Sequence, residues 1–174
     1  MKISIITVTY NVRETVGDCL ASVAAQDYRD REHVVIDGAS TDGTVERLQA
    51  HRAQLAVLVS EPDRGIYDAL NKGLERASGD VVGLLHADDV FADAGVLARV
   101  AEAFADPAVE AVYGDLVYVA REAPDRVVRY WRAEAFDPRR LRWGWMPPHP
   151  TLYLRRTIAS GASTPGTASP PTTT

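Results

Sequence analysis

The chain has 174 residues, of which 46% are hydrophobic and 25% are charged, and this size and composition suit one globular domain with a sizeable apolar core. A net charge of -5 gives no electrostatic footprint for nucleic acid or for anionic lipid, although arginines cluster locally late in the chain. The single cysteine, Cys19, excludes an internal disulfide and a cysteine-based zinc site.

Strand and helix patterns alternate from the first residues onward. Short β-branched runs predict buried strands at 3–9, 33–37, 55–60 and 81–85. Apolar residues at helical spacing predict helices at 14–25, 44–53, 66–77 and 94–104. This order predicts an α/β fold of the Rossmann-like kind, in which a mainly parallel sheet has right-handed crossovers and helices on both faces.

The pattern changes after residue 104. Residues 109–120 predict one longer strand that pairs with a strand at 126–131, an antiparallel addition that makes the sheet mixed. Residues 160–174 (SGASTPGTASPPTTT) hold no large apolar side chain and are expected to be disordered. We therefore expect a domain at 1–156, incomplete at its C-terminal end, and a low-complexity tail at 157–174. A neighbouring reading frame with GC-rich codons gives ordinary domain composition, so a frameshift or truncated gene is a hypothesis that DNA sequencing tests.

The N-terminal segment carries one lysine before a short apolar run. This run is too short for a signal peptide or a membrane span, so we expect a cytoplasmic protein without a transmembrane segment.

Polar side chains follow each of the first four predicted strands. They are Thr9, Tyr10 and Asn11; Asp37; Glu61, Asp63 and Arg64; and His86, Asp88 and Asp89. Because ligands of open parallel sheets bind beyond the carboxyl ends of the strands, we expect these side chains to converge on one crevice. Asp42 is expected to be a turn and cap residue instead.

Asp88 and Asp89 are adjacent carboxylates that repel one another and need a cation. Mg²⁺ or Mn²⁺ is the expected ion, because such ions take one or two carboxylates and complete their shell with water and substrate phosphates. A diphosphate ligand follows. No G-x-G-x-x-G motif comes after the first strand and no G-K-[ST] motif occurs, which disfavours a dinucleotide dehydrogenase and a P-loop ATPase.

The successive segments ISIITVTYN, VVIDGASTDGT, EPDRGIYDALNKGLERASGD and VGLLHADD resemble the pattern of glycosyltransferase family 2, which has a GT-A fold. The EPDRGIYDALNKG segment resembles a subgroup associated with colanic acid and other cell-surface polysaccharides. The resemblance implies that Thr9, Tyr10 and Asn11 line the nucleotide pocket and that Asp37 accepts a hydrogen bond from a uracil-type base. It also implies that Asp88 faces the ribose or donor sugar and that Asp89 binds the metal. The family motif has an acidic residue where this chain has His86, so a ligand contact by His86 and a space-filling role both stay open.

Further donor-site roles fall on the predicted helix at 66–77 and the loop before it. They are assigned to Asp63, Arg64, Asp68, Asn71 and Lys72. Arg64 or Lys72 would neutralise phosphate, against the alternative of ordinary solvated charges. Asp68 and Asn71 share a helix face, which suits donor contacts or capping. Tyr67 would pack beside the sugar or be a half-buried core residue.

The later part of the chain adds three candidates. His149, in W-M-P-P-H-P-T, is a candidate metal ligand by resemblance to GT-A enzymes. Trp143 and Trp145 would form an acceptor platform or cover the sheet. Asp115, in V-Y-G-D, resembles a position near the donor and acceptor sugars.

Family 2 enzymes invert the anomeric centre in one displacement assisted by a carboxylate base. In the family this base usually lies beyond the equivalent of Arg156, whereas this chain has no acidic residue after Asp137, so Asp115 is the substitute candidate. The leading hypothesis is an inverting transferase that moves a sugar from a UDP-sugar to a glycan or lipid-linked acceptor in cell-envelope polysaccharide synthesis. The resemblance leaves peripheral association with the inner face of the membrane open. The alternatives are a non-catalytic nucleotide-sugar-binding remnant and a nucleotidyltransferase, and TYNVRETV is neither glycine-rich nor basic enough for the latter.

Overall fold

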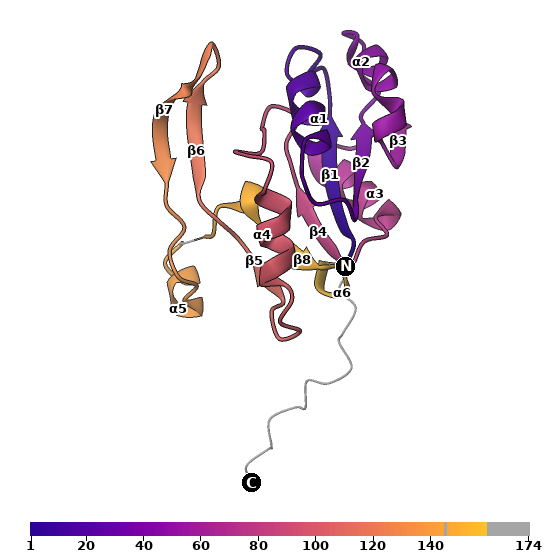
Figure 1. Cartoon of the computed structure of the whole chain (residues 1–174). Coiled ribbons are helices and arrows are strands. Elements are labelled where there is room, and N and C mark those ends of the chain that lie inside the picture. Colours follow the sequence, from indigo (N-terminus) through magenta and orange to yellow (C-terminus); the bar gives the residue numbers. More distant parts are fainter. Residues whose placement is uncertain (145, 160–174) are drawn as a thin grey trace.

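A computed structural model describes residues 1–144 and 146–159 (Figure 1). Its main sheet has six strands in the order β3-β2-β1-β4-β8-β5. The first four are parallel: β1 (Ile3–Thr9), β2 (Arg31–Asp37), β3 (Val57–Ser60) and β4 (Val81–Leu84). The predicted α/β class with a mainly parallel sheet is confirmed.

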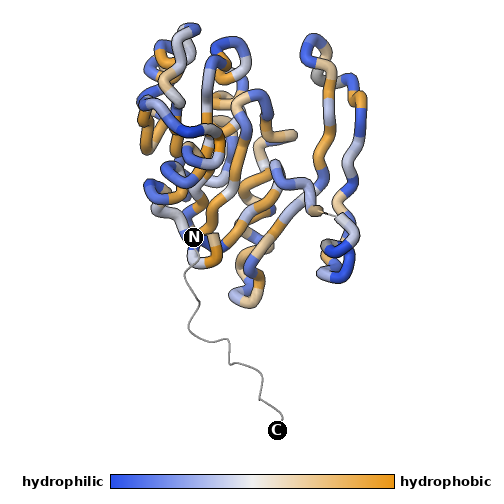
Figure 2. The backbone as a smooth tube through the Cα atoms, turned by 180° about the vertical axis from the view of Figure 1, so that it is seen from behind, coloured by the Kyte–Doolittle hydropathy of each residue, from blue (hydrophilic) through white to orange (hydrophobic). Residues whose placement is uncertain are grey.

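Helices cover both faces of this sheet. They are α1 (Val16–Ala24), α2 (Thr44–Ala50) with the 3₁₀ turn η1 (Arg52–Gln54), α3 (Ile66–Arg76) and α4 (Val96–Ala103). Alternate strand residues face opposite layers, so Ile5 packs with Leu97 of α4, whereas Ile6 packs with Ala69 of α3. The apolar residues lie inside and the polar loops lie outside, as Figure 2 shows along the tube.

The prediction of one long strand at 109–120 is wrong. That segment forms β5 (Ala111–Val112) in the main sheet and β6 (Leu116–Ala120) in a separate two-stranded sheet with β7 (Ala123–Trp131). The chain leaves the main sheet at Gly114, whose N–H and carbonyl are both hydrogen-bonded by the Thr151 hydroxyl, at 3.2 and 2.9 Å. The predicted pairing of residues 126–131 with this segment is confirmed.

The antiparallel member of the main sheet is β8 (Tyr153–Arg155), which lies between β4 and β5. Arg155 holds the turn that follows α4, since its guanidinium donates to the carbonyls of Phe104, Asp106 and Val109. The remaining short elements are α5 (Pro138–Leu141), η2 (His149–Thr151) and α6 (Arg156–Ala159). The predicted domain boundary after residue 156 falls inside α6, and Trp145 and residues 160–174 lie outside the described residues. None of the helices among the described residues is long and apolar enough to cross a membrane.

Two neighbouring residues of β2, Glu32 and His33, are buried titratable groups. Burial lowers the pKa of His33 to about 4, and its Nε2 lies 2.9 Å from the Thr7 hydroxyl. Burial also acts to raise the pKa of Glu32, but hydrogen bonds from Lys2, Ser4 and Ser78 outweigh it and bring the pKa to about 2. The fold therefore stabilises a neutral histidine and a charged glutamate side by side.

We expect the fold to lose stability as the pH falls below the ordinary histidine pKa. Because the pKa of His33 is lower in the folded state, its contribution is complete above pH ~6.5 and is lost as the pH falls towards 4. The expected loss is ~2 kcal/mol at pH 5, measured by urea unfolding at pH 7 and pH 5. In His33→Gln this difference should disappear, and an equal difference in the variant would assign the pH dependence to other groups.

Candidate active site

The carboxyl ends of the parallel strands meet beside a cavity of about 560 Å³. The cavity is lined by Val8, the β1–α1 loop (residues 11–15), Asp42 after β2, Ile66, residues 86–88 after β4 and Arg121. Residues that follow β1, β2 and β4 therefore meet at this cavity, although Asp42 was expected to be only a turn and cap residue.

Asp37 lies at the end of β2 with its side chain fully buried. One carboxylate oxygen accepts from the hydroxyls of Thr9 and Ser40, and the other accepts from the Ser60 hydroxyl and the Ser40 N–H. Burial acts to raise its pKa, but these hydrogen bonds outweigh it, and the pKa lies below its usual value. All acceptor positions of the carboxylate are used within the protein, so in this conformation Asp37 fixes the loop and offers no free oxygen to a base.

The loops after β1 and β2 are tied together around this carboxylate. Asn11 has a left-handed backbone with φ of 53° and accepts from the Thr41 N–H, while its own N–H donates to the Ser40 hydroxyl. Tyr10 is 65% exposed. Asp42 accepts from the N–H groups of Arg13 and Thr44, as expected for a turn residue, while the N-cap of α2 is Gly43.

Gly38 explains how Tyr10 and Asp63 come together at the end of β2. A methyl group at Gly38 would lie 2.6 Å from a carboxylate oxygen of Asp63 and 3.3 Å from the Tyr10 ring. Asp63 also accepts from the Gly65 N–H at 2.8 Å, which fixes the turn before α3. Two of the predicted nucleotide-binding residues therefore flank one glycine.

Asp88 and Asp89 follow β4 in a turn in which the Asp89 N–H donates to the His86 carbonyl. Asp88 is exposed and lines the cavity, whereas Asp89 is partly buried. Burial raises the pKa of Asp89 and the Asp88 carboxylate raises it further, while His86 and His149 oppose the rise. The rings of His86 and His149 meet edge to face with centroids 5.8 Å apart. The structure therefore brings together both predicted metal ligands and the histidine that replaces the acidic residue of the family motif.

The protein ligands at this site suit Mn²⁺ or Mg²⁺ only if substrate phosphates supply further ligands. Among the described residues, no group of three or more histidine, cysteine, aspartate or glutamate side chains is placed to hold a metal ion by itself. Such ions are bound through one or two carboxylates when phosphates and water complete the shell, and imidazole is a suitable additional ligand. Asp89, with His149 beside it, fits that arrangement.

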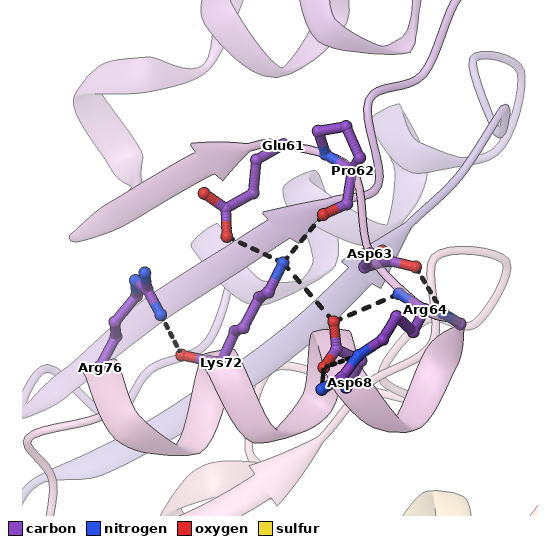
Figure 3. Close-up of polar contacts among 8 residues, drawn as sticks. Glu61, Pro62, Asp63, Arg64, Asp68, Lys72 and Arg76 are labelled. Atoms are coloured by element: carbon purple, nitrogen blue, oxygen red, sulfur yellow. Dashed lines mark hydrogen bonds and ion pairs between the residues drawn. The ribbon is translucent and has the colours of Figure 1, made fainter.

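The charged residues around α3 form an ion-pair network (Figure 3). The Lys72 ammonium lies 2.8 Å from Glu61 and 3.7 Å from Asp68, and the Arg64 guanidinium lies 2.7 Å from Asp68. Asp68 also accepts from the Arg64 N–H, which ties the loop before α3 to its first turn. Both cations predicted to meet phosphate are thus paired with protein carboxylates. The i, i+4 spacing of residues 64, 68 and 72 is the sequence feature from which the pairs with Asp68 could have been predicted.

The other residues expected around α3 are accessible. Asn71 is exposed, and Tyr67 is 81% exposed, so the alternative of a half-buried core tyrosine is wrong. Trp143 is 89% exposed, which rules out a role in covering the sheet.

Asp115 lies where the chain passes from the main sheet into β6. One oxygen accepts from the Ala133 N–H at 2.7 Å and the other from the Tyr130 hydroxyl. The Tyr130 hydrogen bond, with that of Ala133, lowers the pKa of Asp115. A lowered pKa favours the charged form and weakens the carboxylate as a base.

Comparison with known proteins decides the family. Residues 4–168 match the sequence model described as "Glycosyl transferase family 2". The chain belongs to glycosyltransferase family 2. A PGL/p-HBAD biosynthesis glycosyltransferase from Mycobacterium bovis is 34% identical over 88% of this chain and 59% of its own length. An uncharacterized glycosyltransferase from Mycobacterium tuberculosis is 43% identical over 58% of this chain and 39% of its own length. This chain thus spans about two fifths to three fifths of these relatives.

Solved structures confirm the GT-A fold of this family 2 chain. The mannosyltransferase PcManGT from Pyrobaculum calidifontis, in complex with GDP-Man and Mn²⁺, is 32% identical with a TM-score of 0.60 over 65% of this chain and 35% of its own. TarS from S. aureus, residues 1–349, is 24% identical with a TM-score of 0.72 over 92% of this chain and 49% of its own. The family and fold predictions are confirmed, and the colanic acid subgroup stays a prediction.

The family 2 site includes residues that the sequence did not single out. Arg13, Glu14 and Arg121 line the cavity, and the Arg121 guanidinium pairs with Glu14 at 3.2 Å. Arg121 comes from the turn between β6 and β7, more than a hundred positions after Glu14, so no local spacing indicated the contact. The β6–β7 hairpin thus reaches the loop after β1.

Proposed function

We propose that the protein is a metal-dependent inverting glycosyltransferase that transfers a sugar from a nucleotide-diphosphate donor, with UDP-sugar favoured, to a glycan or lipid-linked acceptor of the cell envelope. The observation that carries the proposal is the pair Asp88 and Asp89 at the end of β4, one on the cavity wall and the other beside His149. A cytoplasmic location at the inner face of the membrane suits such an acceptor. Names of relatives in phenolic glycolipid and teichuronic acid biosynthesis support a role in the cell envelope.

The proposed roles follow from the positions of the side chains. The exposed Tyr10 and the tied Asn11 would hold the nucleotide, with Asp63 beside them. Asp89 and His149 would hold Mn²⁺ or Mg²⁺, which when bound neutralises the charge that develops on the departing diphosphate. Asp88 lines the cavity and would orient the ribose or donor sugar.

The cations around α3 have a conditional role in this proposal. Arg64 and Lys72 would reach a phosphate or the donor sugar only by exchanging the carboxylates of Asp68 and Glu61. Asn71 lies on the exposed face of the same helix and would contact the donor from there.

Calorimetric titration of the full chain with UDP, GDP and dTDP, each with and without Mn²⁺, tests the donor site. We expect binding that depends on Mn²⁺, strongest for UDP. Tighter binding of GDP would overturn the choice of UDP but would still support a nucleotide-binding site here. No binding of any nucleotide by a chain that melts cooperatively would reject the proposal.

Asp115 is the proposed base, and Asp115→Asn is expected to lower the transfer rate by ~10²- to 10⁴-fold while nucleotide affinity stays unchanged. Tyr130→Phe is the matched variant, because it keeps the carboxylate and removes the hydrogen bond that lowers its pKa. The acid limb of the rate profile should therefore move to higher pH in Tyr130→Phe. Unchanged transfer in Asp115→Asn would remove Asp115 from the mechanism.

A nucleotide-sugar-binding protein without transfer activity is the second candidate. It is favoured by one observation, that both oxygens of Asp115 already accept hydrogen bonds. Release of free sugar or glycosylated product from a radiolabelled donor distinguishes the two, since a binding protein retains the donor intact.

A further inference from the structure

The segment at 118–146 differs in charge from the chain before it. It holds seven arginines against four acidic residues, whereas residues 1–117 hold ten lysines and arginines against twenty acidic residues. The net charge of -5 therefore hides a basic segment in an acidic protein. Basic surfaces of this kind are attracted to anionic lipid.

The same segment is rich in exposed apolar side chains. Of the fourteen large apolar or aromatic residues exposed among the described positions, eight fall within it: Tyr118, Val119, Val127, Val128, Tyr130, Phe136, Trp143 and Met146. Val128 is 66% exposed beside an irregularity in the β6–β7 pairing, and Trp143 is 89% exposed. Patches this dense on a soluble protein mark an interaction surface.

The hairpin places the arginines among aromatic rings. The Arg129 guanidinium lies 5.6 Å from the Tyr118 ring centroid and 5.9 Å from that of Trp131, and the Arg132 guanidinium lies 5.8 Å from Tyr130. β6 and β7 form their own two-stranded sheet and project beside the main body in both views (Figures 1 and 2). Protein surfaces that lie at the headgroup level of a bilayer are rich in arginine, tyrosine and tryptophan. Their rings enter the interface while their charges stay in water.

We propose that the β6–β7 hairpin, residues 136–144 and Met146 form a surface that docks on an anionic lipid bilayer. Charge complementarity favours this occupant over a second copy, because a two-fold contact of this surface with itself would bring its excess of arginines together. Arg121, at the turn of the hairpin, lines the cavity, so docking would hold the site beside the membrane. The presentation of the site to a lipid-linked acceptor rests on the proposed function. The docking of the surface on a bilayer does not rest on it.

Vesicle binding tests the surface with the full chain. All three tryptophans, Trp131, Trp143 and Trp145, lie in this part of the chain, so intrinsic fluorescence reports on it alone. We expect a blue shift and co-sedimentation with vesicles of phosphatidylcholine and phosphatidylglycerol, weakened by salt, and neither with pure phosphatidylcholine. Arg126→Gln with Arg129→Gln should lower the partition coefficient ~30-fold, because each arginine near an anionic surface contributes roughly fivefold.

The matched control is Arg29→Gln with Arg47→Gln, which removes the same charge from exposed positions outside the segment and should leave vesicle binding unchanged. Equal losses in both double variants would reject a specific surface. A dimer in light scattering that dissociates in the Arg126 and Arg129 variant would assign the surface to a second copy instead. Nucleotide titration of the same samples keeps the two proposals separate, since loss of lipid binding with intact nucleotide binding leaves the donor site standing.

Discussion

Asp89→Ala is expected to weaken Mn²⁺-dependent nucleotide binding by at least ~100-fold, since even residues that only orient a metal ligand are worth 10- to 100-fold. Asp89 is the carboxylate that burial and Asp88 make costly to ionise, and a bound cation removes that cost. Without it, Asp88 and the imidazoles of His86 and His149 are the groups left to hold a metal ion, and a single carboxylate at the cavity wall would hold it weakly. Calorimetric titration with nucleotide at saturating Mn²⁺ measures the change.

Asp93→Ala is the matched control for this experiment. Asp93 is an exposed carboxylate close by in sequence that pairs with Arg99 at 2.9 Å, outside the cavity lining. It should bind nucleotide as the parent does. Mn²⁺ dependence that survives in Asp89→Ala would show that the metal is held elsewhere, and a melt matching the parent would exclude misfolding as the cause of a loss.

The second large effect is expected at Gly83, where substitution should destabilise the fold. Gly83 on β4 is paired with Tyr153 on β8, and a methyl group at Gly83 would overlap the tyrosine ring. Tyr153 is buried in the same core as Leu97 and Phe104, so the ring has no free space to enter. We expect Gly83→Ala to cost ~3 kcal/mol and to lower the melting temperature by ~10 °C.

Two variants make this expectation specific. Gly114→Ala should change stability little, because a methyl group there would have no atom within 4 Å. Combining Gly83→Ala with Tyr153→Val should recover part of the loss, since the smaller side chain vacates the space of the ring. A Gly83→Ala protein as stable as the parent would show that β8 shifts freely along β4.

The parts that sequence reasoning predicted correctly are those with a local signal. The apolar runs that became β1, β2 and β4 and the helical spacing that became α3 are properties of single segments, and each formed close to its predicted range. Asp42 was predicted as a turn and cap residue, and its carboxylate accepts from the Thr44 N–H in the turn before α2, where Gly43 is the N-cap.

The features that were missed depend on partners far along the chain. The break at Gly114 depends on Thr151, and the pairing of Arg121 depends on Glu14. The base-binding role expected of Asp37 has a similar explanation. The hydroxyl of Ser60, on another strand, donates a hydrogen bond to one of the two carboxylate oxygens. The local sequence around these positions does not encode such contacts.

The position of β8 has a consequence for synthesis on the ribosome. The last strand of the sheet inserts between β4 and β5, so the edge of β4 stays open until residues 153–155 emerge from the exit tunnel. An open parallel edge is a template for pairing with other chains. The nascent protein is therefore most exposed to aggregation between the emergence of β4 and the emergence of β8 from the tunnel, and chaperone demand should peak there.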